Sequence, residues 1–371
     1  MYFAKTGKSL TAQGKEIDRP MLQKGGFAMA EGTNSEDFSQ ALETANGVMN
    51  MYGRDLEFFK QKEGIERNSS LAKVWKRWTE RKPIYINPDS KASELNASYS
   101  RVEDKTFGGV LVFNSYPNDY GQTIYTSQNE DIVSHETGHA FLDTILPDLY
   151  TQPRLQTQAI HESVGDLTCL FYQLSQKKNR LKVLEETKGN LHATSFLTLI
   201  AEPLNKGTKY GELRNLINEK RMGQTDCEEH DLSNIFSAAI YELLEELFKT
   251  FKILYRGEEE ERILNRAQCA LRLLLLRSLI EIPYSDPSFS DIGKQMEDLA
   301  KGWKAFEKTD FPKKIKEIFS NRDVNIIKPH TDDDDFCRIN SQQPNQSLKS
   351  PFCTTFQSSL YQKSKWSFNF D

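Results

Sequence analysis

Apolar residues recur every three or four positions along several stretches of the chain, which is the period of an amphipathic helix. Between residues 38 and 65 the pattern runs from Phe38 through Leu42 and Val48 to Phe59. Beyond residue 128 almost every segment carries the same period or a broad apolar stripe. We therefore predict helices over residues 38–65, 129–145, 157–176, 193–202, 232–254, 259–281, 289–307 and 312–320.

Residues 83–126 differ, because β-branched and aromatic residues there are interrupted by turn-forming Pro, Asn, Asp and Gly. We predict strands over 83–87, 96–99 and 109–114. The order of elements indicates an α+β fold with a mixed α/β lobe over 35–134 and a mainly helical lobe over 135–324. Residues 1–34 show no sustained period and are predicted to form a flexible leader. Residues 325–371 are predicted to form a polar tail without its own core.

The composition of the 371 residues narrows the function classes, since 48 Lys and Arg against 53 Asp and Glu give a net charge of −5. No global basic field attracts nucleic acid or anionic lipid, so we expect neither as a partner. Apolar runs such as Leu273 to Leu276 are far shorter than the ~20 residues of a membrane span. The first thirty residues are too polar for a Sec signal peptide. We expect a cytoplasmic protein, or export by a route independent of a signal peptide.

The five cysteines are widely spaced and form no CxxC pair. This pattern argues against a disulfide framework or a cysteine zinc site. Thiols kept in a reducing compartment fit it best.

Residues 135–139 read His-Glu-Thr-Gly-His within a predicted helix. Positions i and i+4 share a helix face, so His135 and His139 can bind one Zn²⁺ through their imidazole nitrogens. Glu136 then lies beside the open coordination position, where it can accept a proton from a water molecule. Three polar side chains in an otherwise apolar segment would be costly to bury without such a purpose.

The segment Ile-His-Glu-Ser-Val-Gly-Asp over 160–166 can supply the third ligand that a zinc site needs. Glu162 provides the carboxylate, and Asp166 lies one turn further on, where it can accept the other ring N–H of a ligating histidine. Asp143, one turn beyond His139, is expected to do the same for the second histidine. His161 competes as a ligand, but it is adjacent to Glu162 and is predicted to be a surface or packing residue.

These motifs resemble the thermolysin-type gluzincins, whose pattern is HExxH followed by a helix carrying ExxxD. The segment 135–143 matches the first part, and Glu162 with Asp166 matches the second. The resemblance extends over roughly residues 40–324. It implies a two-lobed fold with the active-site cleft between the lobes, one zinc ion and hydrolysis of peptide bonds.

The resemblance also assigns roles to residues far along the chain. The segment from His230 to Tyr241 is similar to the family segment whose first histidine stabilises the transition state, so His230 is expected to be catalytic. Asp226 is the candidate carboxylate that orients this histidine, with Glu228 as a rival.

Substrate contacts follow from the same resemblance. Asn96 and Ala97 stand where the family's edge strand pairs with the substrate backbone. Ile132 is the one specificity-pocket residue that we nominate. Tyr150 is the candidate for the tyrosine at the oxyanion, although it stands earlier in the chain than the family pattern requires.

The chain departs from the family pattern in two further places. Glu202 or Pro203 falls where the family has an active-site arginine before a Lys-Tyr-Gly stretch, and Lys206 is a possible substitute. Asp131 occupies a position used for calcium, yet residues 173–182 lack the carboxylates that would complete the site. We therefore do not expect bound calcium.

The leading hypothesis from the sequence is a zinc endopeptidase that hydrolyses protein or peptide substrates with Glu136 as general base. The alternative is a catalytically weakened zinc-binding module of the same fold that recognises a protein partner. Hydrolysis of a non-peptide amide is a third reading compatible with the ligand pattern. The sequence does not indicate an oligomeric state.

Overall fold

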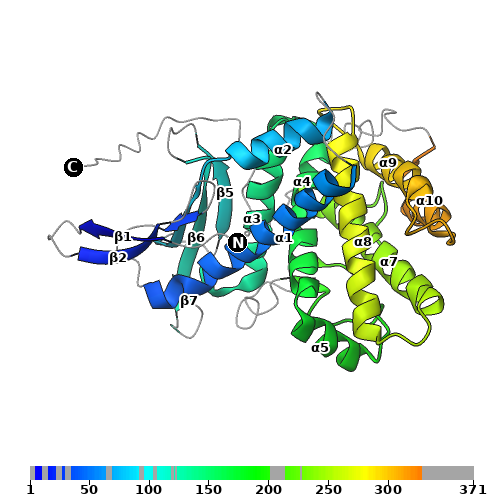
Figure 1. Cartoon of the computed structure of the whole chain (residues 1–371), viewed down its shortest axis with the longest axis horizontal. Helices are drawn as coiled ribbons and strands as arrows, with labels where there is room; N and C mark the ends of the chain where they lie inside the picture. Colours follow the sequence, from blue (N-terminus) through cyan, green and yellow to red (C-terminus); the bar gives the residue numbers. More distant parts are fainter. Residues whose placement is uncertain are drawn as a thin grey trace.

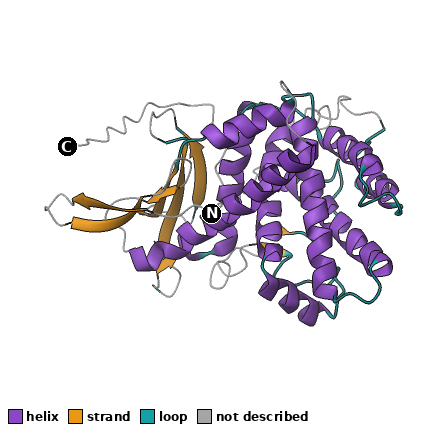
Figure 2. Ribbon diagram, in the orientation of Figure 1, coloured by secondary structure: helices purple, strands orange, loops and turns teal. Residues whose placement is uncertain are grey.

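The computed structural model shows an α+β fold in which a small mixed sheet lies against one side of a larger helical assembly (Figures 1 and 2). The structure describes residues 5–10, 16–21, 27–29, 35–63, 69–91, 96–102, 107–117, 121, 123–200, 214–225 and 228–327. Most of the predicted polar tail lies outside these residues.

The helices of the described residues cover most of the chain after residue 35. They are α1 (Ser35–Glu63), α2 (Ser70–Glu80), α3 (Glu130–Ile145), α4 (Leu155–Ser175), α5 (Lys177–Thr187), α7 (Glu229–Leu254), α8 (Glu260–Glu281), α9 (Phe289–Gly302) and α10 (Phe311–Asn321), with short 3-10 helices η1 (Thr126–Gln128) and η2 (Leu149–Thr151). Among the described residues, no helix combines the length and apolar character needed to cross a bilayer.

The main sheet is mixed and ends on the strand where the sequence predicted a substrate edge. Its strands are β3 (Phe27–Met29), β4 (Ile84–Lys91), β5 (Ala97–Arg101), β6 (Gly109–Pro117) and β7 (Thr123–Tyr125). The order is β3-β4-β6-β5, with parallel pairing of β3 with β4 and of β4 with β6. Strand β5 is antiparallel to β6 and forms the edge, while β7 pairs with the end of β6. The predicted strands are therefore confirmed, each longer at its C-terminal end.

The segment predicted to be a leader contains strands, which the lack of a sustained apolar period did not indicate. β1 (Lys5–Leu10) and β2 (Glu16–Met21) form an antiparallel hairpin, which extends away from the helices in Figure 1. β3 joins the main sheet by pairing with β4. Three ladder residues are too few for alternation to stand out in a sequence.

Helix α1 contacts both the main sheet and helices α3 and α4. Its apolar face is buried along most of its length. Tyr52 stacks on Phe141 of α3 with ring centroids 4.0 Å apart. On the neighbouring face Asp55 pairs with Arg272 of α8, through Oδ2 and Nε at 2.6 Å, and both side chains are buried. The pair joins residues far apart in the chain, and each charge compensates the other's loss of hydration.

Helices α3 and α4 pack against each other through a glycine on each helix. A Cβ at Gly138 would lie 2.6 Å from Thr168 Oγ1, and one at Gly165 would lie 2.6 Å from the His135 ring. The missing side chains let the face of α3 that carries His135 lie directly against α4.

Among the described residues, two α-helices were missed and one helix was predicted wrongly. Helices α2 and α5 were not predicted, and the expected helix 193–202 is wrong. Residues 191–198 form turns in which the Thr198 hydroxyl accepts from the Ser195 amide at 3.1 Å, a local bond that competes with helix formation. The chain then enters β8 (Leu199–Ile200), which pairs with β9 (Arg214–Asn215).

Candidate metal centre

Helix α3 presents the histidines of the HExxH segment from a well-defined start. The Asn129 side chain caps the helix by accepting from the amides of Asp131 and Ile132, at 2.9 and 3.1 Å. One turn of helix then separates His135 from His139, so both rings leave α3 on the same face. Both side chains are buried, with exposures of 6% and 0%.

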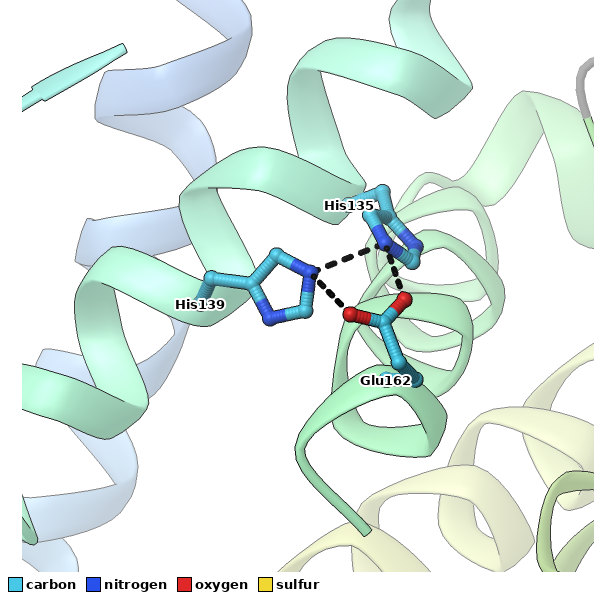
Figure 3. A group of neighbouring side chains, drawn as sticks. All are labelled: His135, His139 and Glu162. Atoms are coloured by element: carbon cyan, nitrogen blue, oxygen red, sulfur yellow. Dashed lines mark hydrogen bonds and ion pairs between the residues drawn. The ribbon is translucent and has the colours of Figure 1, made fainter. Parts of the chain in front are cut away.

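Glu162 of α4 closes a compact group of three ligand atoms with these histidines (Figure 3). The two Nε2 atoms are 2.9 Å apart. Glu162 places one carboxylate oxygen 3.4 Å from His135 Nε2 and the other 3.5 Å from His139 Nε2. Its side chain is fully buried. The sequence prediction that these three residues converge is confirmed.

The spacing of these atoms fits a metal ion. Ligand atoms bound to one tetrahedral ion at ~2.0–2.1 Å lie ~3.3 Å from one another, close to the observed separations. His135 directs Nδ1 toward the Asp166 carboxylate, so its Nε2 keeps a lone pair facing the Glu162 oxygens. The lone pairs of the imidazole nitrogens and the carboxylate oxygens converge in a buried space, which favours the binding of a cation. The residues can therefore hold a metal ion.

The surroundings of Glu162 keep it ionised. Burial by itself raises the pKa of the Glu162 carboxyl, but the site histidines, foremost His230, and Arg214 outweigh that effect and hold the pKa well below its usual range. An ionised carboxylate is the form that ligates a metal.

Asp166 orients His135. Arg214, which the sequence analysis missed, contacts both Asp166 and Glu162. Asp166 Oδ1 lies 3.1 Å from His135 Nδ1, as the sequence predicted. Arg214 of β9 donates from Nη1 to Asp166 Oδ1 and from Nη2 to Glu162 Oε2, the latter at 3.2 Å. Its side chain is only 10% exposed.

Arg214 follows the Lys-Tyr-Gly stretch at 209–211, whereas the resemblance directed attention to the residues before it. Glu202, Pro203 and Lys206 lie outside the described residues. A search for any arginine on either side of that stretch could have found Arg214.

His161, not Asp143, lies beside the second histidine ligand. His139 Nδ1 is 2.7 Å from His161 Nδ1, and the two ring planes differ by only 18° with centroids 4.8 Å apart. His161 is fully buried, which excludes the surface position and leaves the packing role that the sequence allowed. Burial lowers the pKa of the His161 imidazole to about 4.

The expectation that Asp143 orients a ligating histidine is wrong. Asp143 accepts hydrogen bonds from the Tyr99 hydroxyl at 2.6 Å and from Arg101 Nε at 3.0 Å. One turn beyond His139 its side chain faces β5, where these two donors meet it. Asp143 therefore fastens α3 to the edge strand.

Tyr150 packs against His161 and against two residues of β5. Its ring packs edge-on against His161 and Tyr99, with centroids 5.7 and 5.8 Å apart, and lies under the Arg101 guanidinium. These contacts place the Tyr150 ring beside His161, Tyr99 and Arg101. Its expected role at the oxyanion stays a prediction.

His230 reaches the site from the first turn of α7. Its Nε2 lies 3.4 Å from Glu162 Oε2, and the side chain is 8% exposed, so it is neither solvated nor remote. Glu228 accepts from His230 Nδ1 and also caps α7 through the Asp231 amide at 2.8 Å. Hydrogen bonding to His230 lowers the pKa of Glu228 against the opposing effect of burial. Asp226, our first choice for this role, lies outside the described residues.

The remaining predicted residues lie on α3 and at the start of β5. Glu136 is 1% exposed and follows His135 directly. Ile132, one turn before Glu136, is buried. Asn96 accepts from the Ala97 amide at 2.8 Å at the start of edge strand β5, against which α3 packs.

Side-chain amides contact the acidic start of α3. Gln173 Nε2 donates to Glu130 Oε2 at 3.0 Å and to Asp131 Oδ1 at 3.2 Å. Gln176 Nε2 donates to Glu130 Oε1 at 3.0 Å. These contacts connect the start of α3 with the end of α4 through neutral donors.

No known family model matches the chain, and no curated protein sequence matches it significantly. The metal-binding geometry therefore stands on the chain's own residues.

Proposed function

We propose that the protein is a zinc-dependent endopeptidase with the two-lobed organisation of the thermolysin-type gluzincins. The observation that carries the proposal is the buried convergence of two imidazole Nε2 atoms and one carboxylate beside Glu136. Two histidines and one glutamate are the protein ligands of catalytic zinc sites that keep a fourth position open. A purely structural zinc site is closed by four protein ligands and needs no neighbouring base.

The roles of the chain's residues follow from their contacts. His135, His139 and Glu162 hold the ion, which when bound lowers the pKa of a water molecule to ~7 and polarises the scissile carbonyl. Glu136 accepts a proton from the attacking water and passes it to the leaving amine. Asp166 fixes the ring of His135, and Arg214 holds Asp166 and Glu162 in place.

His230 supplies a hydrogen-bond donor for the developing negative charge. Nδ1 is directed at the Glu228 carboxylate and Nε2 at the ligand group, so an N–H on Nε2 would point to where the oxyanion forms. A donor aimed at an oxyanion in a buried site is worth ~2.7–4 kcal/mol of transition-state stabilisation.

The edge strand β5 offers a place for an extended substrate. A peptide that pairs with Asn96 and Ala97 by strand addition would run along the strand that α3 packs against. Ile132 is the candidate side chain for contact with one substrate residue. Protein or peptide is therefore the expected substrate class.

Zinc-loaded protein incubated with a library of proteome-derived peptides tests this function. Wild-type protein should produce internal cleavages that share a local sequence preference, and Glu136→Gln should bind zinc equally well while losing turnover at least 10²-fold. Zinc binding without cleavage by wild-type protein would instead support the protein-interaction module.

A further inference from the structure

Two buried imidazoles face each other directly behind the proposed metal centre. His139 Nδ1 and His161 Nδ1 are 2.7 Å apart, their ring planes differ by only 18°, and neither side chain is exposed. A separation of this size is a hydrogen bond between ring nitrogens. One of the two nitrogens must therefore donate and the other accept.

The metal centre decides which nitrogen carries the hydrogen. A neutral imidazole bears one N–H, and a metal ion binds the nitrogen that lacks it. The Nε2 atom of His139 faces His135 Nε2 at 2.9 Å and Glu162 Oε1 at 3.5 Å. If Nε2 is to ligate, Nδ1 must hold the hydrogen and donate it, and His161 Nδ1 must accept it.

We propose that His161 is a positioning residue whose Nδ1 accepts the Nδ1–H of His139 and thereby holds His139 in its metal-binding tautomer. This inference rests on the metal centre proposed above, but not on the reaction that the centre performs. His161 carries its own hydrogen on Nε2, since a second hydrogen between the two Nδ1 atoms would leave no room for a 2.7 Å contact.

The geometry around His161 fixes the acceptor in place. His161 and Glu162 are consecutive on α4 and so leave the helix about 100° apart, which lets one reach the ligand atoms and the other reach behind His139. The Tyr150 ring packs edge-on against His161 at 5.7 Å.

The two histidine ligands are thus held by different kinds of acceptor. His135 faces the Asp166 carboxylate, whose charge is shared with Arg214. His139 faces a neutral ring, which accepts a hydrogen bond without adding a further negative charge to a buried group that already contains Glu162 and Asp166.

The zinc affinities of two variants at position 161 distinguish a hydrogen-bond acceptor from a side chain that only fills the space. In His161→Asn the amide oxygen can take the place of Nδ1, so the dissociation constant for zinc, measured by chelator competition, should stay within about threefold of wild type. His161→Leu fills the space without an acceptor, and its affinity should fall about 10–100-fold. His192→Leu, at an exposed histidine, is the matched control and should not change affinity.

Equal zinc affinity in His161→Asn and His161→Leu would overturn the positioning role. Failure of wild-type protein to bind zinc would overturn the metal centre itself, so the two failures are distinguishable. Metal-free melting temperatures of the variants show whether a loss of affinity reflects unfolding.

A spectroscopic readout on wild-type protein needs no variant. Two-bond ¹H–¹⁵N correlation spectra of the zinc-loaded protein should show His139 protonated at Nδ1 and His161 neutral with its hydrogen on Nε2. A His161 ring protonated at Nδ1, alone or as an imidazolium, would contradict the assignment.

Discussion

At the scale of single residues, the space for the His135 ring depends on the absence of a side chain at Gly165. A Cβ there would lie 2.6 Å from ring atoms of His135. Gly165→Ala should therefore displace the ring, weaken zinc binding on the order of tenfold and destabilise the protein by about 1–3 kcal/mol.

Gly302→Ala is the matched control, because a Cβ at Gly302 meets nothing within 4 Å. It should keep wild-type zinc affinity. Chelator competition and chemical unfolding of the two variants give the comparison. Equal zinc affinity in both would show that the close approach of α4 to His135 is not needed for binding.

The buried His161 also predicts how stability of the metal-free protein depends on pH. Its pKa is about 4 in the folded state and ~6.5 in an unfolded chain. Between these values the unfolded state binds a proton that the folded state does not, so stability falls as pH falls through this window. His161→Asn should remove about one proton from the difference in proton binding between the two states, and so reduce the slope of the free energy of unfolding against pH. Urea unfolding at several pH values measures it, and an unchanged slope would contradict the burial argument.

The site residues show which contacts a sequence can reveal. The pairing of His135 with His139 was predictable because positions i and i+4 share a helix face, and Asp166 was predictable because one helical turn relates it to Glu162. Arg214 could have been named as a candidate from its place after Lys-Tyr-Gly, but its contacts with Glu162 and Asp166 could not, since they depend on the pairing of β8 with β9. Asp143 was misassigned because a helical wheel does not show which partner, here Tyr99 or Arg101, meets each face.

At the scale of elements, neutral amides join the acidic start of α3 to the end of α4. Gln173→Glu would place a third carboxylate beside Glu130 and Asp131 and remove the donor to both. The variant should lose about 1.5–3 kcal/mol of stability. Calcium should restore part of it, because carboxylate oxygens are the ligands that calcium prefers.

Wild-type protein and Gln61→Glu serve as controls in this experiment. Gln61 lies on the exposed end of α1 and donates to Glu57, so its replacement adds a like charge in solvent. Neither control should respond to calcium. Thermal unfolding with and without calcium measures the effect, and a calcium response of wild-type protein would contradict the account.

Helices with long apolar periods were predictable, whereas short elements were not. Helices α1, α3, α4, α7 and α8 each bury a continuous stripe, which fixes their type from spacing alone. Residues 193–202 contain enough apolar residues to imitate that spacing. Their hydroxyl groups, such as that of Thr198, instead form local bonds that favour turns.

At the scale of the whole molecule, His230 brings α7 to ligands carried by α3 and α4. Its proposed donor acts as charge develops on the substrate, so His230→Ala should lower kcat about 10²–10³-fold with a smaller effect on KM. Zinc content should remain that of wild type. His192→Ala is the control at an exposed histidine. Full activity of His230→Ala, assayed on a peptide that wild-type protein cleaves, would remove His230 from the mechanism.

The general α+β architecture was predictable because strand-rich and helix-rich stretches are separated along the chain. The pairing of β3 with β4 and the β1–β2 hairpin were not, since sheet partners are set by contacts between distant segments. The position of β5 at the edge of the sheet came from the family resemblance, and the strand order agrees with it.

The central claim is that His135, His139 and Glu162 bind one zinc ion. Zinc K-edge X-ray absorption on protein equilibrated with one equivalent of zinc tests it most directly, together with Glu162→Ala. We predict two imidazole nitrogens at ~2.0–2.1 Å and oxygen ligands at ~2.0–2.2 Å, and affinity that falls by orders of magnitude in the variant. A zinc environment without two imidazoles, or unchanged affinity in Glu162→Ala, would contradict the account.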